Sequence, residues 1–179
     1  MRYGMAPETV ARILASQHTI SPHRMALSTV NREGTSFTLI DDSFNANPDS
    51  MKAGLNGLKA WNSNDGKEPF RVALLGAMLE LGADETALHT SIGTYADELG
   101  IDAIIAVGSA QDQHLDALAQ DLADGARQSQ SASVDCVHDI DAAEQLVIDL
   151  ARNHPDAVVL LKGSHASGLS ALAERWAKN

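Results

Sequence analysis

The stretch LIDDSFNANPDSM, residues 39–51, decides the fold because it connects a predicted strand to a predicted helix. An apolar run ends at Ile40, and Asn47 is followed by proline, a pair favoured at a helix N-cap and first turn. Two adjacent carboxylates, Asp41 and Asp42, lie between the two elements. Because ligands bind beyond the carboxyl ends of strands in open parallel sheets, this turn is a candidate binding site.

Downstream of this stretch the sequence alternates between apolar runs and amphipathic segments. The apolar runs predict buried strands at residues 70–76, 102–108, 133–137 and 157–163. The segments between them carry apolar residues at three- and four-residue spacing and predict helices, one of which spans 83–99 and ends at Gly100. Near-continuous apolar strands separated by helices indicate a parallel sheet that is covered on both faces.

Upstream, a short helix is predicted at residues 7–16. The runs 25–30 and 36–41 flank the polar turn NREG, as in a β-hairpin. The sequence therefore predicts an α/β fold. It is a Rossmann-like, doubly wound, mostly parallel sheet with helices on both faces, an N-terminal β-hairpin, and five strand-then-helix units that begin at Ser36.

Composition excludes several classes of partner. The chain has 24 Asp and Glu against 13 Lys and Arg, a formal net charge of -11, which repels nucleic acids and anionic membrane surfaces. No apolar run approaches the ~20 residues that a membrane span needs. The single cysteine, Cys136, provides no disulfide framework and is interpreted as part of the core. We therefore expect a cytoplasmic protein that binds no nucleic acid and does not span a membrane.

The turn after the first parallel strand holds more polar side chains than one helix cap needs. Asp42, Ser43, Asn45 and Asn47 either satisfy turn and cap hydrogen bonds or bind a ribose or a base edge. The spacing leaves both interpretations open.

Lys162 follows the last predicted strand, in the segment LLKGSHASG. Together with the N–H groups of residues 163–167 it predicts an anion site at a helix N-terminus. The alternative is a structural ion pair with Asp41 or Asp42.

Two other strand ends carry weaker candidates, and several motifs are absent. Glu80 is either a ligand contact or a solvated acid, and Ser109 is interpreted as a helix cap. The sequence has no G-x-x-x-x-G-K-[ST] loop, no G-x-G-x-x-G, no zinc spacing among its seven histidines and no Ser-His-Asp set. These patterns favour a binding domain without its own catalytic or metal-binding residues.

The segment DDSFNANPDSM, residues 41–51, resembles the DDSYNANPDSM signature of the Mur ligase family, in particular of members that add D-alanyl-D-alanine. LLGAMLELG at 74–82 and LLKGSHASGL at 160–169 agree in order, and residues 22–25 are similar to the family's arginine-bearing domain junction. The similarity implies that residues 21–179 form the family's carboxyl-terminal domain, and that residues 1–20 are a remnant of the central ATPase domain or linker.

The resemblance implies an ATP-dependent carbon–nitrogen ligase of bacterial peptidoglycan precursor synthesis. Such enzymes phosphorylate the carboxylate of UDP-N-acetylmuramoyl-tripeptide (UDP-MurNAc-tripeptide) with ATP, and D-alanyl-D-alanine then attacks the acyl phosphate. ATP and Mg are expected to be bound mainly by the central domain, and the UDP end of the substrate by the N-terminal domain. The N-terminal and central domains are therefore expected partners of this chain, and the chain is expected to be inactive without them.

Site residues follow from the resemblance position by position. Arg24 and Asp42 are expected to reach the nucleotide, because a guanidinium pairs with phosphate oxygens and a carboxylate accepts from ribose hydroxyls. Phe44, Asn45 and Asn47 are expected beside the base.

The donor side follows in the same way. Lys162, Ser164 and His165 are expected to face the dipeptide or the acyl phosphate. No residue of the chain is expected to be catalytic or to bind a metal. Rate enhancement would come from orienting the amine toward a carbonyl that is activated elsewhere.

The sequence departs from the family pattern at three positions. Phe44 stands where tyrosine is usual, Ala77 where aspartate is common, and His165 where arginine is expected. The last change replaces a permanent cation with one that titrates near neutral pH.

Two alternatives differ in function. The first is another Mur-type or a folate-type amino acid ligase, against which the intact NANPDSM segment argues. The second is a receiver-like signalling module, suggested by the acidic pair and the lysine at strand ends. That module needs a phosphoacceptor aspartate after the middle strand, where this chain has Val107, Gly108 and Ser109.

Overall fold

The computed structural model of the 179-residue chain describes residues 23–62, 68–129 and 131–178. Its strands are β1 (Ala26–Arg32), β2 (Thr35–Asp42), β3 (Arg71–Gly76), β4 (Ala103–Val107), β5 (Ser133–Val137) and β6 (Val158–Lys162). Its helices are α2 (Pro48–Ala60), α3 (Glu85–Glu98), α4 (Gln113–Ala126), α5 (Ile140–Asn153) and α6 (Leu169–Trp176), with 3-10 turns η1 (Gly82–Asp84) and η2 (His165–Ser167). The predicted helix at 7–16 and the predicted remnant at 1–20 lie outside the described residues.

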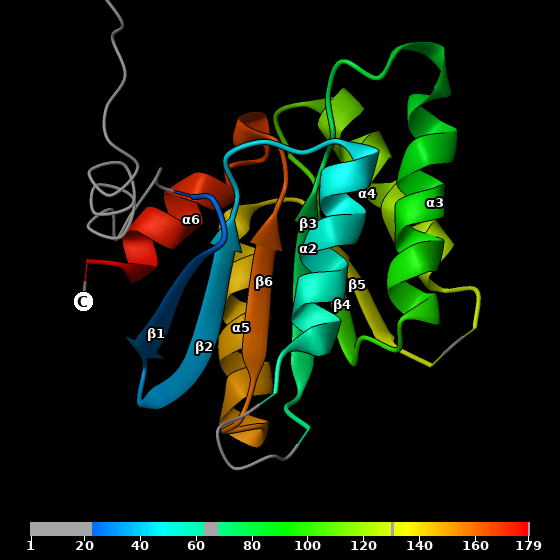
Figure 1. The fold of residues 1–179 in the computed structure, drawn as a ribbon. Helices are drawn as coiled ribbons and strands as arrows, with labels where there is room; N and C mark the ends of the chain where they lie inside the picture. Colours follow the sequence, from blue (N-terminus) through cyan, green and yellow to red (C-terminus); the bar gives the residue numbers. More distant parts are fainter. Residues whose placement is uncertain (1–22, 63–67, 130, 179) are drawn as a thin grey trace, which may run out of the picture.

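The six strands form one sheet in the order β1-β2-β6-β3-β4-β5 (Figure 1). β1 and β2 pair antiparallel, which confirms the predicted hairpin, and all other neighbours pair parallel. The five predicted strand-then-helix units are therefore confirmed. β6 lies between β2 and β3, so the last unit is beside the first, and the register places Lys162 opposite Asp42.

Helices cover both faces of the sheet, as the sequence predicts. One core cluster joins α2, α3 and α4 to one face, and a second joins α5 and α6 to the other. In Figure 1, α2 and α3 lie in front of the sheet and α5 lies behind it. Leu55 and Leu58 of α2 are fully buried, and each such side chain contributes about 1.5–3 kcal/mol by leaving water.

The start of α2 confirms the predicted cap. Asn47 Oδ1 accepts a hydrogen bond from Ser50 N at 2.8 Å, and Ser50 Oγ accepts one from Asn47 N at 3.0 Å. Pro48 occupies the first turn, where its missing N–H leaves no bond unmade. This capping box fixes where the chain leaves the turn after β2 and enters the helix.

Two local predictions meet different outcomes. The predicted helix at 83–99 is present as η1 followed by α3, and Gly100 ends it at φ 66 with its N–H donated to Asp97 O. The prediction that Ser109 caps α4 is wrong, because Asp112 Oδ1 accepts from His114 N and Leu115 N instead. Ser109 closes only a short turn, accepting from Gln111 N at 3.3 Å.

Cys136 lies on β5 and packs, partly buried, against the core, in agreement with its interpretation as a core residue. Burial raises the pKa of its thiol. Among the described residues, the helices are too short or too polar to cross a membrane.

Candidate functional site

The two adjacent carboxylates at the end of β2, Asp41 and Asp42, point to opposite faces of the sheet, because side chains alternate along a strand. Asp41 Oδ2 lies 2.7 Å from His23 Nδ1, and Asp41 Oδ1 accepts from Ser43 N at 3.2 Å and Ser43 Oγ at 2.6 Å. Asp42 Oδ2 lies 2.6 Å from Lys162 Nζ. Asp41 thus holds His23, which precedes β1, and Asp42 joins β2 to β6 through Lys162.

Lys162 makes the contacts of the ion-pair alternative. Its side chain is only 2% exposed, and its ammonium also donates to Asn45 O at 3.2 Å. The stem passes over α2 at Gly54, where an added Cβ would lie 2.7 Å from Lys162 Cδ. The cation therefore neutralises Asp42 and supports the backbone of the polar turn from within the fold.

The anion site predicted from Lys162 and the following N–H groups is not formed as expected. Ser164 N donates to Ala77 O at 2.9 Å, and Ser167 N donates to Ser164 O at 3.0 Å. Two of the five predicted donors are thus used within the fold, and Lys162 is held by Asp42. The prediction assumed free donors, whereas the loop after β6 uses the Ser164 N–H to pack against the loop after β3 and the Ser167 N–H to close its own turn.

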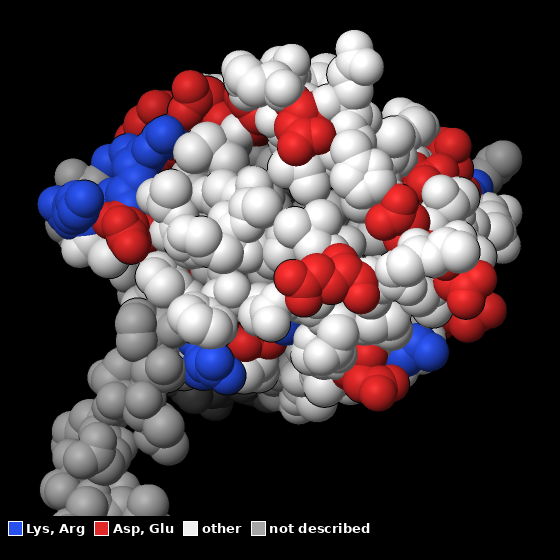
Figure 2. All heavy atoms as spheres, turned by 90° about the horizontal axis from the view of Figure 1, so that it is seen from above, with Lys and Arg blue, Asp and Glu red and all other residues white. Residues whose placement is uncertain are grey.

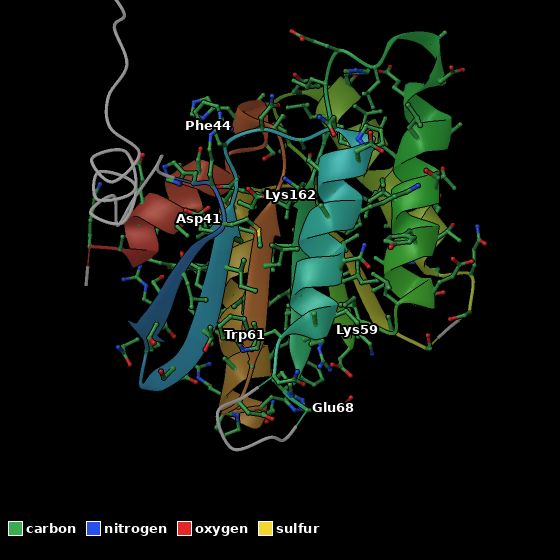
Figure 3. All side chains as sticks on the ribbon, viewed as in Figure 1. Asp41, Phe44, Lys59, Trp61, Glu68 and Lys162 are labelled. Carbon is green, nitrogen blue, oxygen red and sulfur yellow. The ribbon has the colours of Figure 1, made fainter. Side chains whose placement is uncertain are left out.

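An open cleft of about 690 Å³ lies at this end of the sheet. It is lined by residues that follow three strands: 44–47 after β2, 79–81 after β3, and 164–166 after β6. Figure 3 shows Phe44, Asp41 and Lys162 near this end, and Trp61 and Glu68 at the opposite end. The sheet order explains the cleft, because β2, β6 and β3 are neighbours whose carboxyl ends meet.

Ser164 and His165 form the β6 side of the cleft. Ser164 is 4% exposed, and its Oγ has no hydrogen-bond partner among the described residues. His165 is exposed, and its Nδ1 lies 3.1 Å from the Oγ of buried Ser170. A buried hydroxyl without a partner costs free energy, so a shift of the loop that let a ligand atom bond to Ser164 Oγ would recover that cost.

A smaller cavity of about 170 Å³ shares the turn after β2 with the cleft. Arg24, Phe44, Asn45 and Asn47 all line it, and the guanidinium of Arg24 lies 4.3 Å from the centre of the Phe44 ring. Asp42 does not line either cavity. The structure thus brings together four of the five predicted nucleotide residues, whereas the fifth, Asp42, is paired with Lys162 outside the cavity lining.

Both predicted amide side chains also serve the backbone. Asn45 Oδ1 accepts from Ala46 N at 2.8 Å, and Asn47 Oδ1 caps α2. Glu80 is exposed on the cleft wall, with a positive φ of 63. The turn-and-cap interpretation therefore accounts for the amide oxygens of Asn45 and Asn47, and it leaves the exposed faces of these residues toward the cavities.

The β3 wall depends on a residue that the sequence did not single out as functional. His89 of α3 is fully buried, and its Nε2 accepts from Met78 N at 2.9 Å. Burial lowers the pKa of its imidazole below the ordinary value. A lone histidine among the apolar positions of a helix resembles an ordinary core residue, so its only sequence signal was that it follows the 74–82 segment.

At the cleft end of the molecule, the charged side chains of the described residues are unevenly distributed. Seen from this end, the middle of the surface is mostly uncharged, acidic side chains are scattered over it, and basic ones lie toward its margins (Figure 2). Within residues 23–62, 68–129 and 131–178, no three His, Cys, Asp or Glu side chains group as metal ligands.

Comparison with known proteins connects this geometry to a family. A family model described as "Mur ligase, glutamate ligase domain" matches residues 23–165. The UDP-N-acetylmuramoyl-tripeptide–D-alanyl-D-alanine ligase of Mycobacterium leprae is 37% identical over 180 residues, which cover 96% of this chain and 33% of the relative. The Escherichia coli ligase of the same name is 40% identical over 70 residues, covering 39% of this chain and 14% of the relative. The chain thus spans about a third of the length of the mycobacterial relative.

Solved structures share the fold. A structure of MurF from Acinetobacter baumannii matches with a TM-score of 0.73 and 24% identity, covering 98% of this chain and 35% of the other. A folylpolyglutamate synthase/dihydrofolate synthase from Yersinia pestis, complexed with AMPPNP and Mn, matches with a TM-score of 0.64 and 17% identity over 97% of this chain and 35% of the other. With the sequence matches above, the chain belongs to the Mur ligase family, and its fold is that of the family's carboxyl-terminal, glutamate ligase domain.

Proposed function

We propose that this chain closes over the nucleotide and binds the amino donor in an ATP-dependent ligase that adds D-alanyl-D-alanine to UDP-MurNAc-tripeptide through an acyl phosphate. The observation that carries the proposal is the cleft, because residues from all three segments that resemble the family line it. Relatives that are 37% identical over 96% of the chain are named for this reaction. Its biological setting would be peptidoglycan precursor synthesis in the cytoplasm.

The β6 side of the cleft fits the donor. Ser164 Oγ can donate to a carboxylate oxygen, and the exposed imidazole of His165 can do the same or carry a charge. Lys162 would support the donor site indirectly, from within the fold, by neutralising Asp42 and fixing the carbonyl of Asn45. The donor's amine would then be held in line with a carbonyl activated elsewhere, so that orientation supplies the rate enhancement.

The smaller cavity fits part of an adenine nucleotide. Phe44 is 43% exposed and offers a ring face for stacking, while Asn45 and Asn47 lie beside it. Arg24 can move from the Phe44 ring to phosphate oxygens, to which guanidinium groups bind strongly. Asp42 would reach a ribose only with the oxygen that Lys162 leaves open. ATP would supply the phosphoryl group that activates the substrate carboxylate.

Magnesium and the triphosphate would be bound mainly by the central domain of the same ligase. The sequence lacks a phosphate-binding loop of the G-x-x-x-x-G-K-[ST] type. We therefore propose that the chain alone is inactive, and that its partners are the enzyme's own N-terminal and central domains, ATP, the tripeptide substrate and the dipeptide. Residues 1–20 would connect it to the central domain.

A donor screen tests the proposal. The chain, joined to the two preceding ligase domains, is assayed for phosphate release with UDP-MurNAc-tripeptide and D-alanyl-D-alanine. Parallel reactions replace the donor with single amino acids, or replace both substrates with a folate acceptor and L-glutamate. Activity that requires D-alanyl-D-alanine supports the proposal. Activity only with another donor or with the folate pair would assign the chain to another ligase of the family.

Variants in the same assay locate the donor. Ser164→Ala and His165→Ala are expected to raise KM for D-alanyl-D-alanine about tenfold, the effect of losing one hydrogen bond to a charged group, and to leave KM for ATP within about twofold. Ser109→Ala, in the turn before α4, is the matched control and should change neither constant. Unchanged donor KM in both site variants would remove the β6 loop from the donor site.

A further inference from the structure

His89 lies behind the cleft and has no role in the function proposed above. Its side chain is fully buried, Nε2 accepts a hydrogen bond from Met78 N at 2.9 Å, and Nδ1 lies 2.7 Å from Glu85 O. A backbone N–H can only donate and a carbonyl oxygen can only accept. Nε2 must therefore be unprotonated, and the ring is neutral with its proton on Nδ1.

Met78 begins the loop that forms the β3 wall of the cleft, residues 78–82. Its side chain is fully buried, and residues 79–81 line the cleft. Within this loop Glu80 has a φ of 63, a left-handed conformation that is strained for a non-glycine residue. Such a conformation persists only where neighbouring contacts determine it.

Two hydrogen bonds hold the start of this loop, one from each side. Ala77 O accepts from Ser164 N at 2.9 Å, which attaches it to the loop after β6. Met78 N donates to His89, which attaches it to α3. Without the acceptor on His89, the buried N–H of Met78 would lose its partner, which is unfavourable and favours rearrangement of the loop.

We propose that His89 is a positioning residue: by accepting the Met78 N–H, it fixes the β3 wall of the cleft opposite Ser164. The identity of the ligand rests on the proposed function, whereas the placement of the wall does not. Protonating Nε2 would set two N–H groups against each other, release Met78 and loosen the wall.

The charges around His89 set the direction of its pH dependence. Burial lowers the pKa of His89 below its ordinary value of 6.5, and the hydrogen bond to the Glu85 backbone and the carboxylates of Asp121 and Glu85 oppose this shift. His114 on α4 adds to the lowering. The folded state thus favours the neutral ring, so the contact is complete above pH 6.5 and is lost only as the pH falls through the lowered pKa of His89.

The unmodified chain provides the first test. Long-range ¹H–¹⁵N NMR spectra of the imidazole identify the protonated nitrogen, and a titration from about pH 7.5 to about pH 5 follows the ring and the backbone amides together. We expect a proton on Nδ1, and shifts of the Met78, Leu79 and Glu80 amides with the midpoint of His89. A proton on Nε2, or loop amides that do not follow His89, would overturn the proposal.

Two variants separate the effect of the hydrogen-bond acceptor on His89 from the effect of its side-chain volume. His89→Gln keeps an oxygen that can accept from Met78, and His89→Leu keeps the bulk without an acceptor. In the joined ligase we expect KM for the donor to rise about tenfold in His89→Leu and to stay within about twofold in His89→Gln, as for the loss of one hydrogen bond. Equal effects of the two substitutions would mean that the acceptor does not matter.

The control is His138→Leu, which makes the same change at an exposed histidine that pairs with Asp116 at the far edge of the sheet. It should leave donor KM unchanged. Should His89→Leu fail to fold, the titration of the unmodified chain still decides. A chain that binds no donor but shows the coupled shifts would refute the proposed function and support the positioning role of His89. A chain that binds the donor without coupled shifts would support the proposed function and refute the positioning role of His89.

Discussion

Replacing Lys162 with methionine isolates the ion pair between β6 and β2, because methionine keeps most of the apolar stem and removes the ammonium. Lys162 is 1% exposed, and its Nζ lies 2.6 Å from Asp42 Oδ2 and 3.2 Å from Asn45 O. The substitution leaves the Asp42 carboxylate, whose side chain is 18% exposed, without its cation. It also leaves the Asn45 carbonyl without this donor.

The magnitude follows from burial. Removing one partner of a fully buried ion pair costs about 3–5 kcal/mol. Because Asp42 keeps some contact with water, we expect Lys162→Met to lower the free energy of unfolding by about 2–3 kcal/mol. For a chain of this size one kcal/mol corresponds to about 2–4 °C, so Tm should fall by about 4–12 °C.

The contribution of the ion pair to stability is measured in a double-mutant cycle that combines Lys162→Met with Asp42→Asn. Unfolding by urea and by heat is monitored by circular dichroism. The double variant should lose less than the sum of the two single losses, with a coupling energy of about 1–2 kcal/mol. Lys178→Met, at an exposed lysine, is the control and should change stability by less than about 0.5 kcal/mol. Additive losses, or a Lys162→Met variant as stable as the control, would refute the ion pair.

Three further predictions concern packing, pH and the nucleotide. Gly54→Ala should lower the free energy of unfolding by about 1–2 kcal/mol in urea, because the added Cβ would lie 2.7 Å from Lys162 Cδ; unchanged stability would contradict this packing. Burial raises the pKa of Glu144, but hydrogen bonds led by that from Arg175 outweigh it and hold the pKa below 4.5. This contribution to stability is present above pH 4.5 and lost as the pH falls, so Tm should depend less steeply on pH in Glu144→Gln below that value. Phe44→Ala should raise KM for ATP about tenfold in the joined ligase while Phe44→Tyr stays near the unmodified value, as expected if a ring face stacks on the base; equal KM values would exclude stacking.

The strands and their order of appearance could be predicted because each apolar run is bounded by polar turns. The start of α2 could be predicted because Asn47 and Pro48 are both specific for a helix N-terminus. The start of α4 could not, because Ser109 and Asp112 are both good capping residues and only the packed structure selects between them. Local sequence preferences rank such choices but do not resolve them.

The position of β6 in the sheet was the most important feature that the sequence did not predict. Nothing local in the sequence states that the last strand lies between the first two parallel strands. That neighbourhood pairs Lys162 with Asp42, and it engages the Ser164 amide with Ala77. The sequence thus located the residues of the cleft, through strand ends and resemblance, but it could not show which of their donors are already used.

The most direct test of the central claim is a backbone-amide NMR titration of this chain with D-alanyl-D-alanine and, separately, with Mg-ATP. We predict shifts at residues 163–167 with the dipeptide and at residues 42–47 with the nucleotide, since residues 164–166 line the cleft and residues 44–47 line both the cleft and the adjoining cavity. Millimolar binding is sufficient to detect them. A well-dispersed spectrum in which neither ligand shifts these residues would contradict the claim that the strand ends of this domain form the donor and nucleotide site.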